Sequence, residues 1–252
     1  MRLVAKELQR FAVRPAARWV AAGMLVYVVT VVVLAAFTSD GGGLARTVTD
    51  GELAGYALVP VLFACVAGAL LAAGPNGGTR ALLTVEPRRD RVYRLRAVAA
   101  ALAVLPGVAA AYLLLASGLW GVALVAGPAD DPGTTTDAAG LLPALAWSGA
   151  RVLVLAGCAA VAGAAVGAAV GRWWAAVSVV PVALLGLEVI LAGLAAERWS
   201  PLAHARAWVA GPAASDAGTS VGPWWLSGLF LLGAVAVVTT VGLLAFRRRE
   251  LR

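Results

Sequence analysis

Few residues in this 252-residue sequence are of the types that carry out catalysis or bind metals. The only histidine is His204, which excludes a two-histidine zinc helix and any histidine-rich cluster. A Ser-His-Asp arrangement of Ser200, His204 and Asp216 is formally available, but nothing marks a nucleophile turn. The only lysine is Lys6, and no glycine-rich loop precedes it, so the chain lacks a phosphate-binding P-loop. We therefore expect no catalytic residue, metal or cofactor, and any ATP that drives this protein must bind another polypeptide.

The composition indicates an integral membrane protein. Hydrophobic residues make up 62% of the chain and charged residues 13%, and the mean hydropathy is +0.89. A soluble domain usually carries about 25% charged residues. The net charge of +7 would suggest nucleic acid in a soluble protein, but here it first indicates topology, and we expect no nucleic-acid partner. The excess of arginine and alanine is typical of a GC-rich bacterial genome.

Apolar stretches long enough to cross about 30 Å of hydrocarbon recur along the chain. They predict an all-α, polytopic fold with one transmembrane domain over residues 1–252. Ahead of the first span, basic residues stand four apart at positions 2, 6, 10, 14 and 18, and Pro15 interrupts the pattern. This predicts an amphipathic helix over residues 1–16 on the membrane surface, although a plain basic anchor explains the charges equally well. The six predicted spans cover residues 17–37, 55–74, 97–120, 150–171, 173–195 and 224–246.

The basic residues predict the orientation. If both termini are cytoplasmic, 16 of the 20 arginine and lysine residues lie in the inner segments, as the positive-inside rule requires. Tryptophans also fall near the ends of the predicted spans, as in an interfacial aromatic belt. We expect a multi-pass protein of the bacterial plasma membrane, in contact with membrane lipid.

Two features inside the spans stand out. Gly163, Gly167 and Gly171 are spaced four apart, which allows two helices to approach closely. Glu188 is the one acidic residue within a span, and ionisable groups in hydrocarbon usually have a partner or a function. Arg151, near the outer start of the preceding span, is the candidate partner for a structural ion pair. The alternative for Glu188 is a role in substrate passage or gating.

The predicted outer loop, residues 196–223, contains signals for a short helix. Ser200 is a good N-cap, Pro201 fits the first helical position, and Gly211 with Pro212 ends the helix. We expect this helix to lie at the outer interface, with His204 on its surface.

Residues 75–96 join the second and third predicted spans and contain six arginines. After a glycine-rich turn, the residues of this segment predict a short helix with Leu82 and Leu83 on one face. Pro87 ends this helix. Basic charge alone explains the side of the membrane, but it does not require a capped helix with an apolar face.

This segment resembles the cytoplasmic coupling segment of the permease subunits of type-2 ATP-binding-cassette exporters, particularly the small bacterial ones. The matching residues are Gly78, Thr79, Leu82, Leu83, Pro87, Arg88 and Arg89, and the basic "FRRREL" exit from the last span is also similar. The resemblance implies six spans, an exporter that works as a dimer of this chain or with a similar permease, and docking of a separate P-loop ATPase on residues 75–96. A membrane sensor or accessory protein that only binds a partner is the alternative, and a secondary transporter is the third.

Overall fold

The computed structural model describes residues 9, 15–38, 53–73, 88–126, 138–212 and 221–248. Within these ranges the secondary structure is entirely helical, which confirms the all-α prediction. The elements are α2 (Pro15–Thr38), α4 (Leu53–Ala72), α6 (Arg89–Ala126), α7 (Ala138–Val170), α8 (Trp173–Gly193), the 3-10 turn η1 (Glu197–Trp199), α9 (Pro201–Ala210) and α11 (Trp224–Arg248).

Six of these helices are long and apolar enough to cross a membrane, and they correspond to the six predicted spans. Two of them are longer than expected. α6 begins at Arg89 and has 38 residues, and α7 begins at Ala138 and has 33. At 1.5 Å per residue, α6 is about 57 Å long, well beyond the roughly 30 Å of a hydrocarbon core. The predicted helix over residues 1–16 lies outside the described residues except at positions 9, 15 and 16.

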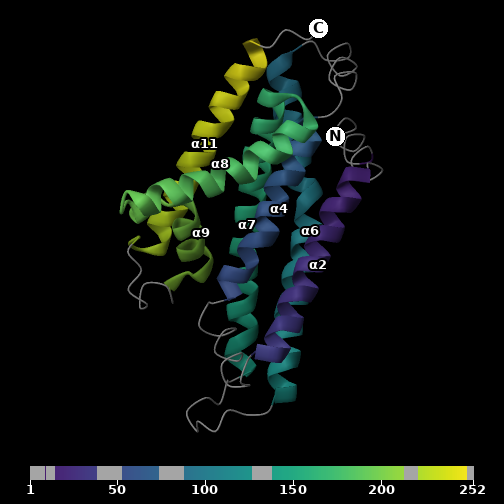
Figure 1. Ribbon diagram of the computed structural model, residues 1–252, viewed down its shortest axis with the longest axis vertical. Coiled ribbons are helices and arrows are strands. Elements are labelled where there is room, and N and C mark those ends of the chain that lie inside the picture. The colour runs from purple at the N-terminus through teal and green to yellow at the C-terminus, as the bar shows by residue number, and fades with distance from the viewer. Residues whose placement is uncertain are drawn as a thin grey trace.

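Helices α2, α4, α6 and α7 run along the long axis of the molecule, and α9 lies to one side of them (Figure 1). The first residues of α2 and the last residues of α11 lie toward the upper end of this view. We call this the basic end, because it carries the exposed arginines Arg88, Arg91, Arg94, Arg247 and Arg248. The opposite end of the bundle is the far end.

The closest helix contact joins α4 and α7, where small residues let the two backbones meet. A methyl group on Gly163 would run into the carbonyl of Cys65, and one on Gly167 into the carbonyl of Ala69. Two of the three glycines that the sequence singled out therefore lie at this contact. Gly171 does not, because it follows the last residue of α7 with a φ of 69° and donates its N–H to the Gly167 carbonyl at 2.8 Å.

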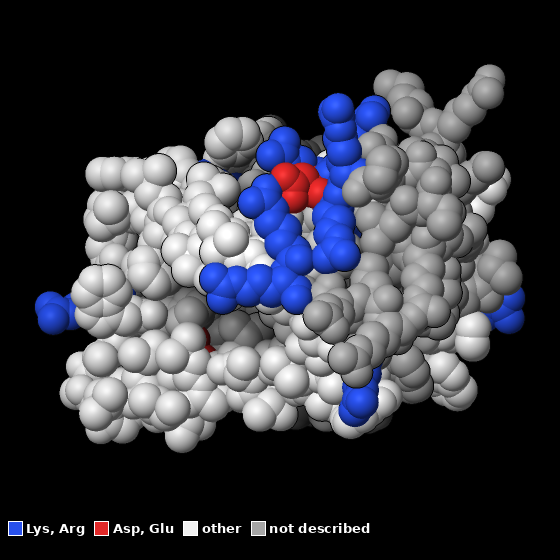
Figure 2. Space-filling view, turned by 90° about the horizontal axis from the view of Figure 1, so that it is seen from above, with Lys and Arg blue, Asp and Glu red and all other residues white. Residues whose placement is uncertain are grey.

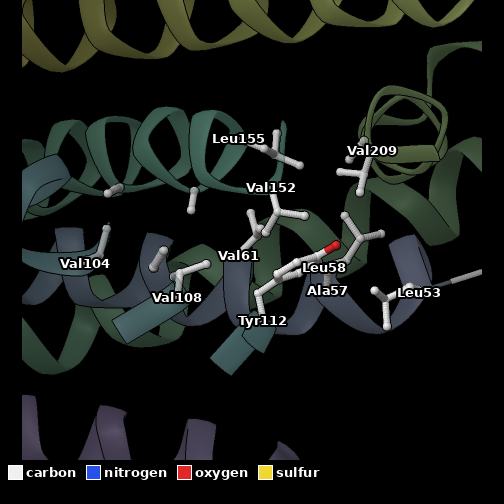
Figure 3. Packing of buried hydrophobic residues seen from close by; sticks show 14 of the residues in the cluster. Leu53, Ala57, Leu58, Val61, Val104, Val108, Tyr112, Val152, Leu155 and Val209 are labelled. Atoms are coloured by element: carbon white, nitrogen blue, oxygen red, sulfur yellow. The ribbon is translucent and has the colours of Figure 1, made fainter. Parts of the chain in front are cut away.

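The main hydrophobic core lies around this pair of helices and extends to α9. Val61 of α4, Val152 and Leu155 of α7, and Val209 of α9 point toward one another (Figure 3). Val152 and Val209 are at most 1% exposed. The apolar face of α9 is thus part of the core, and this fixes the short helix against α4 and α7.

Candidate functional site

Helix α9 has the ends that the sequence predicts. Ser200 is the N-cap, and its Oγ accepts a hydrogen bond from the Ala203 N–H at 2.9 Å. Pro201 occupies the first helical position, where its missing N–H costs nothing. Gly211 ends the helix with a φ of 69°, a conformation that glycine adopts without strain.

Glu188 of α8 completes the cap. Its Oε2 accepts a hydrogen bond from the Ser200 hydroxyl at 2.6 Å, and its Oε1 accepts one from the Leu202 N–H at 2.8 Å. The N–H groups at the second and third positions of α9, which have no partner within the helix, are therefore satisfied by Glu188 and Ser200. The negative charge also lies at the positive end of the helix dipole. Glu188 thus holds α9 against α8.

Arg151 of α7 lies at the opposite end of α9, and the predicted pair with Glu188 is not formed. The Arg151 guanidinium packs so closely on Gly211 that any side chain there would collide with it. Its carbon lies 4.5 Å from the ring centre of Trp224 and 5.2 Å from that of Trp147. The prediction is corrected for a physical reason: each charge meets the end of α9 whose backbone dipole has the opposite sign, so the two do not need each other.

His204 is buried, and the prediction of a surface histidine is wrong. The residue is 4% exposed, and its ring stacks on Phe230 with 3.9 Å between ring centres. Nε2 lies 3.0 Å from the Arg198 carbonyl, which only accepts, so Nε2 carries the proton. Nδ1 lies 3.0 Å from the Ser227 Oγ and accepts from it in the neutral ring. Burial lowers the pKa of His204 below its usual 6.5, and the bond to the Arg198 carbonyl offsets only part of this effect.

Besides the charged residues around α9, a second cluster of charged residues lies at the basic end, where basic side chains gather on the surface (Figure 2). Asp90, in the first turn of α6, pairs with Arg247 in the last turn of α11, and Arg247 Nε donates to Asp90 Oδ1 at 2.7 Å. Arg89 Nη1 donates to the Arg247 carbonyl at 2.9 Å, and the Tyr93 hydroxyl donates to the Thr239 carbonyl at 2.8 Å. The start of α6 is therefore joined to the end of α11.

Arg96 joins the same part of α6 to α4. The residue is 4% exposed, and its Nη1 donates to the carbonyl of Ala72, the last residue of α4, at 3.1 Å. A cation at the C-terminus of a helix is favoured by the unpaired carbonyls and by the helix dipole. This buried arginine acts within the bundle, and only a part of the arginine cluster remains on the surface.

The predicted coupling residues fall into two groups. Gly78, Thr79, Leu82, Leu83 and Pro87 lie outside the described residues. Arg88 is exposed, whereas Arg89 is turned toward α11. Asp90 was missed from the sequence, although an acid flanked directly by Arg89 and Arg91 is itself a signal for an internal ion pair.

The described residues contain no group of three or more His, Cys, Asp or Glu side chains that could hold a metal ion. Comparison of the sequence with known protein families and with curated proteins found no match.

Proposed function

We propose that this chain is the membrane-spanning permease subunit of an ATP-driven exporter in a bacterial plasma membrane. In this proposal both termini and residues 75–96 are cytoplasmic, and a separate P-loop ATPase docks on residues 75–87 and on the exposed Arg88 beside them. The chain forms the path for the substrate and carries out no covalent chemistry. The proposal combines the resemblance of residues 78–89 with the way the two ends of that segment are attached to the bundle.

The proposal rests on the contacts that attach the two ends of this segment to the bundle. The segment leaves α4 at Ala72 and enters α6 at Arg89. Arg96 bonds the end of α4 to α6, and the contacts of Arg89 and Asp90 with Arg247 bond α6 to α11. A displacement of residues 75–87 by a partner would therefore reach three membrane-crossing helices together. A loop that only carried charge would not need both of its ends bound in this way.

The outer faces of three helices support a second copy of the chain or a similar permease. In the most apolar stretch of α2, of α8 and of α11, only 11% is buried inside the bundle. In the corresponding stretch of α4, 67% is buried. Large side chains such as Val189 of α8 and Val237 of α11 are 72% and 63% exposed. In a membrane these faces contact acyl chains or another helical surface, and the proposed dimer uses part of them.

The test is purification of the chain from its native membrane, followed by a search for a bound P-loop ATPase. Leu82→Asp combined with Leu83→Asp should leave membrane insertion intact, because the arginines that set the topology remain. It should abolish ATPase binding and substrate-stimulated hydrolysis, since two charges would be buried in the contact.

The matched control is Arg91→Gln with Arg94→Gln, which removes two exposed charges at the same end and should weaken binding far less. A leucine variant that still co-purifies with a fully coupled ATPase would refute the docking role. If no ATPase co-purifies with the unaltered chain, the accessory-protein alternative is favoured.

A further inference from the structure

A narrow apolar cavity of about 80 Å³ lies between α2, α4 and α6. The residues that line it include Met24 of α2, Phe63 and Ala67 of α4, and Ala103 and Val108 of α6. None of the described residues that line it carries a polar side chain. Ala21 of α2 also lines the cavity and is exposed, so the cavity is open to the outside of the bundle beside α2.

The cavity exists because the two halves of α2 pack differently. In the second half, Val28 is buried in a small cluster with Ala111 and Leu115 of α6. Toward its first residues α2 leans away from α6 (Figure 1). Met24 lies at the boundary, where its methyl group would be 3.2 Å from a Cβ added to Gly107. Alanine is the commonest lining residue, so the side chains do not fill the space that opens beyond Met24.

The surroundings of the cavity decide what fills it. Each of the three helices is long and apolar enough to cross a membrane, and all the lining residues lie within these apolar stretches. A membrane that immerses α2, α4 and α6 therefore immerses the cavity, and the medium at its open side is hydrocarbon. A water molecule would need about two to four polar partners, which the lining side chains do not offer. The occupant is therefore apolar.

The size of the cavity selects among apolar molecules. Its 80 Å³ is half of the roughly 150 Å³ of an engineered protein cavity that takes up benzene. A ring system does not fit, whereas an unbranched chain can place some of its methylene groups inside. Phospholipid chains are the most abundant molecules at this depth of a membrane, so mass action favours them. We propose that the cavity binds one straight acyl chain of a membrane phospholipid, which completes the packing of α2 against α4 and α6. This site does not depend on the proposed transport function.

The experiment is photo-cross-linking in reconstituted bilayers. A phosphatidylcholine with a diazirine in the middle of one straight acyl chain is added to the bilayer, and the cross-linked residues are identified by peptide mass spectrometry. The yield at Phe63, which lines the cavity, is divided by the yield at Val29, which is 52% exposed on α2. This ratio should be higher when the bulk lipid has methyl-branched chains than when it has straight ones, because only the straight chain of the probe then fits the cavity.

Three variants decide the assignment. Gly107→Leu places a side chain in the cavity beside Met24, and Ala21→Leu narrows its opening from an exposed position that does not disturb the core. Both should lose most of the cross-linking at Phe63 and keep that at Val29, which shows that the chain is still inserted. Gly121→Leu is the matched control, because it makes the same change on α6 where a side chain meets open space. Its ratio should equal that of the unaltered chain.

Three results would overturn the proposal. If the unaltered chain is labelled at Val29 but not at Phe63, α2 or another segment closes the cavity and no lipid enters it. If Gly107→Leu and Ala21→Leu both keep the ratio of the Gly121→Leu control, the label at Phe63 does not come from the cavity. If the ratio is the same in branched and straight bulk lipid, the cavity does not select a chain by its shape, and Phe63 contacts only the lipid that surrounds the whole bundle.

Discussion

Replacing Glu188 with glutamine tests how α9 is held, because it removes the charge and keeps the size of the side chain. The carboxylate accepts hydrogen bonds from Ser200 Oγ at 2.6 Å and from Leu202 N at 2.8 Å. Hydrogen bonds to a charged group contribute about 1.5–3 kcal/mol each and neutral ones about 0.5–1.5 kcal/mol. The lost charge at the helix N-terminus adds about 0.3–1 kcal/mol. We expect Glu188→Gln to lower the stability of the folded chain by about 2 kcal/mol.

The assay is thermal unfolding of the detergent-purified chain, followed by tryptophan fluorescence, in a double-mutant cycle with Ser200→Ala. For a chain of this size about 2 kcal/mol corresponds to a fall of roughly 4–8 °C in the unfolding midpoint. Because Glu188 and Ser200 share a hydrogen bond, the double variant should lose less than the sum of the single losses, by about 0.5 kcal/mol or more.

The matched cycle combines Glu188→Gln with Arg151→Gln. These residues lie at opposite ends of α9, a ten-residue helix about 15 Å long, and they share no partner. Their effects should therefore add to within about 0.5 kcal/mol. A strong coupling between Glu188 and Arg151, or none between Glu188 and Ser200, would refute the assignment of the two charges to the two ends of the helix.

Two further predictions concern the core and pH. Gly163→Ala should destabilise the chain by about 1–3 kcal/mol, because its methyl group meets the Cys65 backbone, whereas Gly157→Ala on the same helix meets open space and should be neutral or stabilising in the same unfolding assay. Because burial lowers the pKa of His204, the unfolded chain binds the proton more readily. The contribution of His204 is therefore complete above about pH 6.5 and is lost as the pH falls through the folded-state pKa, by at most about 1.4 kcal/mol per pH unit. An unfolding midpoint that falls between pH 6.5 and 5 just as steeply in His204→Gln would contradict this.

The sequence is sufficient to predict the elements whose signals are local. A run of about twenty apolar residues marks each span, and Ser200, Pro201 and Gly211 mark the ends of α9. Helices α6 and α7 extend beyond the predicted spans because hydropathy measures the part of a helix that lies in hydrocarbon, and a helix continues beyond it wherever no residue breaks it. Asp90 in the first turn of α6 favours that continuation.

The partners of the charged residues could not be predicted from the sequence, because they depend on how the helices pack. Pairing Glu188 with Arg151 treats side chains as the only partners, whereas the structure satisfies Glu188 with a backbone N–H and a hydroxyl of α9. The sequence predicts a surface position for His204 because it predicts that the short helix lies at the outer interface. Its burial depends on the packing of α9 against α11, where Ser227 and Phe230 surround the ring.

The contact between α4 and α7 has a consequence for the order of events during synthesis. Cys65 and Gly163, whose backbones meet, are 98 positions apart in the chain, and α6 lies between the two helices in sequence. At roughly 5–20 residues per second, α4 is made about 5–20 s before the surface that it packs against. During this interval its row of small residues faces lipid or the insertion machinery. The central pair of the bundle is therefore completed only after four of the six apolar helices have been made, so the early helices must remain inserted without their final neighbours.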